Sequence, residues 1–138
     1  MAAKKNLLFL CMANSVRSQM AEGLARHLLG AQVTVQSAGL SPSSVSRYAV
    51  ASLAELDIDI SGQQSKSVFK IKADSVDTVI TLCSDPVCPP GLLGATQLHW
   101  PIPVPESYPG DLSENYARVR DEIDQRLRDW AVQEGLQF

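Results

Sequence analysis

The alternation of short apolar runs with stretches of helical periodicity constrains the fold of this chain more than any other feature. Residues 7–10 form a continuous apolar run, which is typical of a strand buried on both faces. Apolar residues then recur at helical spacing over residues 18–29, and Gly30 ends the predicted helix. A second strand is expected over residues 32–36, followed by a loop over residues 37–42.

The rest of the chain continues this alternation. The further predicted elements are a helix over residues 46–56, strands over residues 77–82 and 96–100, and a last helix that Ser113 caps. Residues 66–72 fit either a short helix or an extended connection, and four prolines predict an extended loop over residues 101–111. The order of elements predicts an α/β fold of three layers, with a mainly parallel four-stranded sheet and helices on both faces.

Length and composition exclude several classes of protein. The 138 residues predict one domain spanning residues 1–138. The formal net charge of −3 argues against a nucleic-acid-binding surface, and no apolar run approaches the ~20 residues of a membrane span. Because the first apolar run is also too short for a secretory signal, we expect a cytoplasmic protein. No stretch indicates a spare apolar face, so a monomer is expected.

The stretch between the first strand and the first helix carries the main functional signal. Cys11 is followed by five residues, then Arg17 and Ser18, at the predicted start of a helix. Backbone N–H groups at a helix N-terminus favour an anion, and an arginine adds a bidentate clamp on two of its oxygens. The same positive surroundings favour the thiolate form of a cysteine, which is the nucleophile. The expected oxyanion-binding loop comprises Met12, Ala13, Asn14, Ser15, Val16 and Arg17.

The chain contains three cysteines, an odd number that cannot all pair internally. Cys83 ends a predicted strand, and ligands bind beyond the carboxyl ends of parallel strands, so Cys11 and Cys83 would face one crevice. Taken alone, Cys83 is more typical of a small core side chain, whereas the proline-flanked Cys88 is either an idle surface thiol or a redox group. His27 is interpreted as a surface residue and His99 as structural, and the spacing of these groups predicts no metal site.

Several stretches of the sequence resemble a known family. Cys11-x5-Arg17-Ser18, followed by residues 19–23 and 37–39, is similar to the low-molecular-weight tyrosine phosphatase superfamily. Within it, the chain resembles the thioredoxin-coupled arsenate reductases in residues 14–22, 59–63, 81–85, 99–100 and 118–123. The resemblance covers nearly the whole chain, and the two cysteines at and after the third strand favour the reductases over the phosphatases.

The resemblance implies a three-cysteine relay that reduces arsenate, as in arsenical resistance by detoxification, and that needs no cofactor. Cys11 would attack the arsenic while Arg17 and the loop amides hold the oxyanion, and Ser18 would favour the Cys11 thiolate. Cys83 would then attack Cys11 and release arsenite. Cys88 would attack Cys83 in turn, leaving a redox-active Cys83–Cys88 disulfide for thioredoxin to reduce.

Two positions depart from those relatives. The relatives carry an Asp-Pro proton donor just after the His-Trp stretch, whereas here Glu106 and Asp111 are the nearest candidates, and the sequence does not decide between them. Lys66 stands where the relatives have a carboxylate of a potassium site. The lysine ammonium is therefore expected to replace the ion, and no response to potassium is expected.

Three other functions remain open. The same fold, with Cys11 and Arg17, would serve a phosphotyrosine or small phosphomonoester phosphatase, which would not need Cys83 or Cys88. The reductant could be glutathione, mycothiol or glutaredoxin in place of thioredoxin. The loop could also belong to a non-catalytic oxyanion-binding or phosphocysteine carrier module, which would bind anions without turnover.

Overall fold

The chain forms a parallel sheet flanked by helices, and its computed structural model describes residues 5–84 and 90–137. The strands are β1 (Lys5–Cys11), β2 (Val33–Gly39), β3 (Thr78–Thr81) and β4 (Thr96–His99), and the α-helices are α1 (Arg17–Leu29), α2 (Arg47–Ala54) and α3 (Leu112–Gln133). The described residues also include the short 3₁₀ helices η1 (Val68–Lys70), η2 (Ala73–Ser75), η3 (Pro90–Leu92) and η4 (Pro105–Ser107). The strands pair in parallel in the order β2-β1-β3-β4, which confirms the predicted order of elements and the four-stranded parallel sheet.

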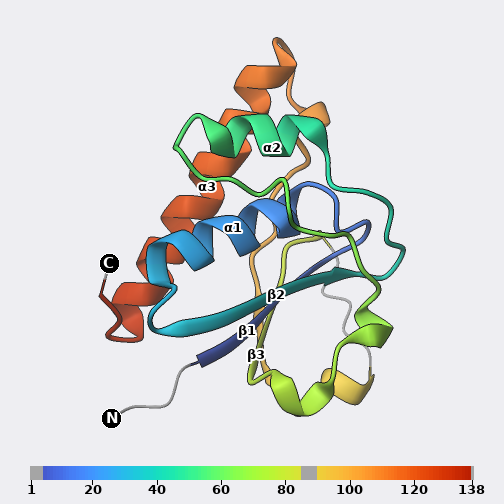
Figure 1. Cartoon of the computed structure of the whole chain (residues 1–138), viewed down its shortest axis with the longest axis vertical. Coiled ribbons are helices and arrows are strands. Elements are labelled where there is room, and N and C mark those ends of the chain that lie inside the picture. The colour runs from blue at the N-terminus through green and yellow to red at the C-terminus, as the bar shows by residue number, and fades with distance from the viewer. Residues whose placement is uncertain (1–4, 85–89, 138) are drawn as a thin grey trace.

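The two faces of the sheet are covered differently (Figure 1). On one face, Leu7 and Phe9 of β1 pack with apolar side chains of α1, α2 and α3. On the other face, Leu8 and Leu10 pack with side chains from η1 and η3. The connection from β2 to β3 contributes to both faces, because its helix α2 packs on the side of α1 and its 3₁₀ helix η1 packs on the other. Helices therefore lie on both faces as predicted, the α-helices on one and the 3₁₀ helices η1 and η3 on the other.

β2 is longer than the sequence predicts, since residues 37–39 belong to the strand and not to a loop. These residues pair with residues 9–11 of β1, so that Gly39 lies beside Cys11 at the carboxyl end of the sheet. The sequence pattern misses this extension because residues such as Ala38 and Gly39 are weak strand formers, which here are kept extended by pairing with a buried strand.

The prediction that Ser113 caps the last helix is wrong. Asp111 is the N-cap of α3, and its side-chain oxygen accepts a hydrogen bond from the backbone N–H of Glu114. The ambiguous segment at residues 66–72 contains η1, and the proline-rich loop at residues 101–111 contains η4. Within the described part of the chain, no helix is long and apolar enough to cross a membrane.

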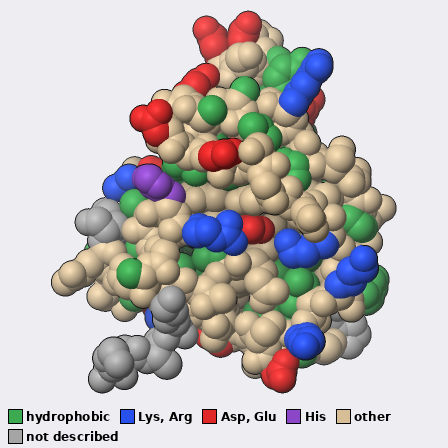
Figure 2. Space-filling view, in the orientation of Figure 1, with side chains coloured by type: hydrophobic (Ala, Val, Ile, Leu, Met, Phe, Trp, Pro, Cys, Tyr) green, Lys and Arg blue, Asp and Glu red, His purple; other side chains and the backbone are tan. Residues whose placement is uncertain are grey.

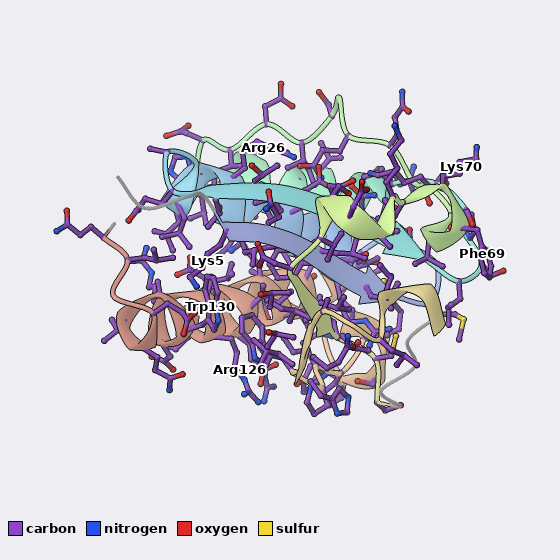
Figure 3. The ribbon with its side chains drawn as sticks, turned by 90° about the horizontal axis from the view of Figure 1, so that it is seen from below. Lys5, Arg26, Phe69, Lys70, Arg126 and Trp130 are labelled. Atoms are coloured by element: carbon purple, nitrogen blue, oxygen red, sulfur yellow. The ribbon has the colours of Figure 1, made fainter. Side chains whose placement is uncertain are left out.

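The strands all end at the same edge of the sheet, because their pairing is parallel. Cys11 is the last residue of β1, and Cys83 follows closely after the end of β3. In Figure 3, β1 runs from Lys5 toward the end of the molecule where Phe69 and Lys70 of η1 lie. The two cysteines that the structure describes therefore share one edge, as the sequence predicts.

Candidate active site

Residues 12–17 form the anion loop, which connects β1 to α1 with its carbonyl oxygens turned outward. The carbonyls of Met12, Ala13 and Ser15 accept hydrogen bonds from backbone N–H groups of the segment at residues 41–46. In a planar trans peptide the next N–H points the opposite way, so the amides of the anion loop turn toward its interior. The loop thus presents the cradle of N–H groups that an oxyanion requires.

The anion loop packs closely against Gly39 at the end of β2. A Cβ atom at this position would lie 2.7 Å from the carbonyl oxygen of Met12 and 2.8 Å from the backbone nitrogen of Asn14. Both contacts are shorter than van der Waals separations, and both involve backbone atoms that cannot rotate away. Because glycine lacks a Cβ, β2 can support the loop at this distance.

The Cys11 side chain is buried beneath the loop, with 3% of its surface exposed, and its sulfur lies 2.9 Å from Ser18 Oγ. Asn14 Nδ2 donates a hydrogen bond to the same Oγ at 2.8 Å. The Ser18 hydroxyl is therefore an acceptor for Asn14, and its own proton is free to point at the sulfur. A hydroxyl donor in this direction stabilises negative charge on Cys11, which is the role predicted for Ser18.

Asn14 ties the anion loop to its surroundings. It adopts a φ of 48°, its side chain is fully buried, and its Nδ2 donates a second hydrogen bond, to Ser37 Oγ at 2.9 Å. Its Oδ1 accepts from the Lys66 backbone N–H at 2.9 Å, and the Ser37 hydroxyl donates to the buried carboxylate of Glu22. Glu22 in turn pairs with Arg26 at 2.8 Å and lies 3.9 Å from Lys66 Nζ. Buried hydrogen bonds on both polar atoms of the Asn14 side chain therefore hold the loop in one conformation.

Arg17 reaches from the start of α1 across to two neighbouring segments. Its Nη1 donates to the carbonyl oxygen of Leu82 at 3.2 Å and to that of Ile102 at 2.9 Å. The guanidinium is thereby held between the end of β3 and the proline-rich loop. An oxyanion in the anion loop would offer Arg17 charged acceptors, which bind more strongly than these two neutral carbonyls.

A cavity of about 500 Å³ opens beside Arg17, a volume within the range of small-molecule sites. Its lining comprises Met12, Arg17, Cys83, Ser84 and residues 101–104. Among the described residues that line it, no carboxylate occurs. Arg17 is therefore the charged group that these residues present to a ligand.

Cys83 is half-buried and lines the same cavity as Arg17. Burial raises the pKa of the Cys83 thiol, and the negative charge of Cys11 raises it further, while Arg17 and the Met12 N–H oppose the rise. Cys11 and Cys83 are both free thiols, and Cys88 lies outside the described residues. The structure thus brings Cys83 within electrostatic reach of Cys11 and Arg17, the two residues predicted to start the reaction.

The two candidates for the proton donor lie apart from the described lining of the cavity. Asp111 is engaged as the N-cap of α3, where it accepts the Glu114 N–H at 3.0 Å. Glu106 is exposed and accepts a hydrogen bond from the Tyr116 hydroxyl at 3.0 Å. Within residues 5–84 and 90–137, no group of three or more His, Cys, Asp or Glu side chains could hold a metal ion.

Sequence reasoning missed part of the support around the anion loop. Ser65 Oγ donates to the carbonyl of Ala13 at 3.0 Å, and Gln19 Nε2 donates to the carbonyl of Asn14 at 3.1 Å. The segment with Ser65 is remote in sequence from the loop, and no local pattern signals such a contact. The Ser65 bond forms because the fold places two remote segments side by side.

The chain is similar to known proteins over most of its length. Residues 6–88 match the family model of low molecular weight phosphotyrosine protein phosphatases. The chain is 39% identical over 130 residues to arsenate reductase 2 of Staphylococcus saprophyticus, covering 91% of this chain and 95% of that protein. A solved structure of an arsenate reductase in the phosphate-binding state has a TM-score of 0.83 at 35% identity, over 94% of this chain and 98% of that chain. A thioredoxin-dependent arsenate reductase of Corynebacterium glutamicum has a TM-score of 0.74 at 29% identity, over 96% of this chain and 62% of that chain.

Proposed function

Because the chain belongs to the low molecular weight phosphotyrosine protein phosphatase family and is similar to arsenate reductases over most of its length, we propose that it is an enzyme that reduces arsenate to arsenite. The proposed reaction is a relay in which Cys11, Cys83 and Cys88 act in turn and thioredoxin restores the thiols. The observation that carries it is the placement of Cys83, which lines the same cavity as Arg17 and whose pKa the charges of Cys11 and Arg17 shift in opposite directions. A phosphatase of this fold needs no such second thiol.

In the first step, the Cys11 thiolate attacks the arsenic of an arsenate held in the anion loop. An S–As bond forms, and one arsenate oxygen takes up protons and leaves as water. The loop N–H groups and Arg17 stabilise the charge on the remaining oxygens in the transition state. Arg17 reaches them by exchanging the carbonyls of Leu82 and Ile102 for the oxyanion.

In the second step, the Cys83 thiolate attacks the Cys11 sulfur. An S–S bond forms, the S–As bond breaks, and its electron pair stays on arsenic, which leaves as arsenite. Burial is the main cause that raises the pKa of the Cys83 thiol, and the charge of Cys11 adds to it, while Arg17 and the Met12 N–H lower it and favour the attacking thiolate.

In the third step, Cys88 attacks Cys83, which frees Cys11 and leaves a Cys83–Cys88 disulfide for a dithiol protein such as thioredoxin. The proposal places this relay in the cytoplasm, in a monomer, with residues 1–138 forming one domain. It involves no nucleic acid. In support, the Lys and Arg side chains on the face drawn in Figure 2 are interrupted by uncharged and acidic side chains and form no continuous basic patch there.

The second candidate function is that of a phosphatase, which the family and the pair of Cys11 and Arg17 favour. A phosphate ester needs a proton on its leaving oxygen, and general acid help contributes about 10²–10⁴-fold. The described lining of the cavity contains no carboxylate for this purpose. Arsenate loses water more readily than an ester loses an alkoxide, so the site suits the reductase better.

The test is arsenate-dependent NADPH oxidation in the presence of thioredoxin and thioredoxin reductase. For the wild type we expect turnover, and for C11S, C83S and C88S we expect none in the steady state. C88S should still release a single equivalent of arsenite, because the first disulfide forms without Cys88. If C83S cycles like the wild type, the relay is wrong, and hydrolysis of p-nitrophenyl phosphate by C83S would then identify a phosphatase. Anion binding by the wild type without any turnover would identify a carrier module.

A further inference from the structure

We propose that His99 is a positioning residue that holds Cys83 in place for its attack on Cys11, an inference that rests on the proposed function. His99 is the last residue of β4, and its ring Nε2 lies 2.6 Å from the carbonyl oxygen of Cys83. Because a carbonyl oxygen only accepts hydrogen bonds, the ring nitrogen carries the proton and donates it. His99 therefore acts on Cys83 through the backbone of that residue.

This hydrogen bond takes the place of a link that is missing from the sheet. β3 and β4 pair as far as Thr81 and His99. In a regular parallel ladder, the N–H of Ile102 would next bond the carbonyl of Cys83, but it bonds the carbonyl of Leu82 instead, at 3.1 Å. The ladder of β4 thus leaves the Cys83 carbonyl to the His99 ring.

A bond from a side chain can open without disrupting the sheet. Leu82, one residue earlier, is held by Arg17 and by the backbone of Ile102, whereas Ser84, one residue later, is exposed. Cys83 therefore lies between a residue that is held in the sheet and a residue that is exposed at the protein surface. The relay requires Cys83 to stay near Cys11 for one exchange and then to meet a different thiol. A single side-chain bond at this point satisfies both requirements.

The variants that test this role separate the hydrogen bond from the shape of the ring. H99F keeps a planar ring and removes the donor, whereas H99Q places an amide N–H near the position of Nε2. H27F is the matched control, because His27 is an exposed histidine on α1. Thermal melting of each variant reports whether the fold is intact.

The first measurement needs no arsenate and follows alkylation of Cys83 by iodoacetamide in the C11S/C88S background, where Cys83 is the only thiol. We expect H99F to react about tenfold faster, which is the factor that one ordinary hydrogen bond contributes to an equilibrium. H99Q and H27F should react at the rate of the unchanged background. Equal rates for H99F and the background would overturn the proposal, as would equally fast reaction of H99F and H99Q.

The second measurement is single-turnover arsenite release in the C88S background. We expect H99F to release arsenite about tenfold more slowly and H99Q to restore the rate, with the concentration dependence on arsenate unchanged. An equal loss in H99F and H99Q would assign the ring a purely structural role and overturn the proposal. Failure of the His99-containing C88S protein to release arsenite would overturn the proposed function instead, and the alkylation rates would still decide the role of His99.

Discussion

The anion loop and the end of β3 each carry a cysteine, yet the structure holds them in opposite ways. The loop around Cys11 is fixed on all sides, by the buried amide of Asn14 and by close contact with Gly39. Cys83 is half-buried, and side chains hold the backbone at and just before it, with Arg17 on the preceding carbonyl and His99 on its own. Cys11 therefore lies beneath a loop that several contacts fix, whereas Cys83 lies just after β3, where two side-chain hydrogen bonds hold the backbone.

The difference follows from what each sulfur must do in the proposed relay. A nucleophile that always meets the same small anion gains from a cradle that is built before the substrate arrives. A thiol that must react with two different sulfurs in succession cannot be fixed in one geometry. The proposed relay therefore needs a fixed backbone around Cys11 and a backbone at Cys83 that can be released. Arg17 joins the two regions, because it belongs to the anion loop and donates a hydrogen bond to the Leu82 carbonyl.

Changing the residue that joins the two regions should have the largest effect. Arg17→Lys removes the planar fork that spans the oxyanion and keeps the positive charge. We expect kcat/KM for arsenate to fall by about 10²–10³-fold, the usual effect of losing one oxyanion donor. Arg126→Lys is the control, because Arg126 is an exposed residue of α3. A value for the Arg17 variant within a few-fold of the wild type would remove Arg17 from the mechanism.

A substitution that disturbs the contact between β2 and the anion loop tests whether the loop is fixed. Gly39→Ala places a methyl group 2.7 Å from a backbone oxygen of the anion loop, so the loop or β2 must shift. We expect the free energy of unfolding to fall by about 1–3 kcal/mol, as for other overpacked sites. Urea denaturation measures it, and Gly62→Ala is the control, since a Cβ there would meet nothing within 4 Å. Equal stability of the two variants would show that the loop adapts and is not a fixed cradle.

The electrostatic link between the two regions predicts a smaller effect, on the pH dependence of Cys83. Burial and the charge of Cys11 raise the pKa of the Cys83 thiol, so its alkylation should rise at a higher pH than that of an ordinary cysteine. In the C88S background, C11S removes one of these causes and should move the midpoint to lower pH. Arg17→Ala removes an opposing charge and should move it to higher pH. Midpoints that do not move in either variant would show that Cys83 is not coupled electrostatically to Cys11 or Arg17.

Sequence patterns predicted the anion loop better than the end of β3, for a physical reason. The apolar run at residues 7–10 and the spacing of Cys11 and Arg17 are local features, and local features decide where a strand ends and a helix begins. The role of His99 depends on a one-residue irregularity between two strands, which no local pattern encodes. The same holds for the extension of β2, where pairing with a buried neighbour overrides weak strand propensity.

The buried side of the cradle was predictable in its residues but not in its connections. Asn14 was predicted as a residue of the loop, and its side chain bonds Ser37 and the backbone of Lys66. Its link through Ser37 to the buried Glu22 joins the anion loop, β2 and α1. Tertiary packing decides which of these side chains meet. A sequence pattern can therefore indicate the residues but not the hydrogen bonds between them.

The smallest effect is expected from the choice of monovalent cation, sodium or potassium, in the buffer. Glu22 already pairs with Arg26 at 2.8 Å and lies 3.9 Å from Lys66 Nζ, so its charge is compensated within the chain. Replacing sodium by potassium at equal ionic strength should therefore leave the melting temperature and kcat/KM unchanged. Lys66→Met should cost no more than about 1 kcal/mol, as for a partly exposed ion pair, and should introduce a response to potassium. A clear potassium-specific rise in the melting temperature or kcat/KM of the wild type would contradict this prediction. It would mean that the Lys66 ammonium does not replace the ion and that potassium binds near Glu22.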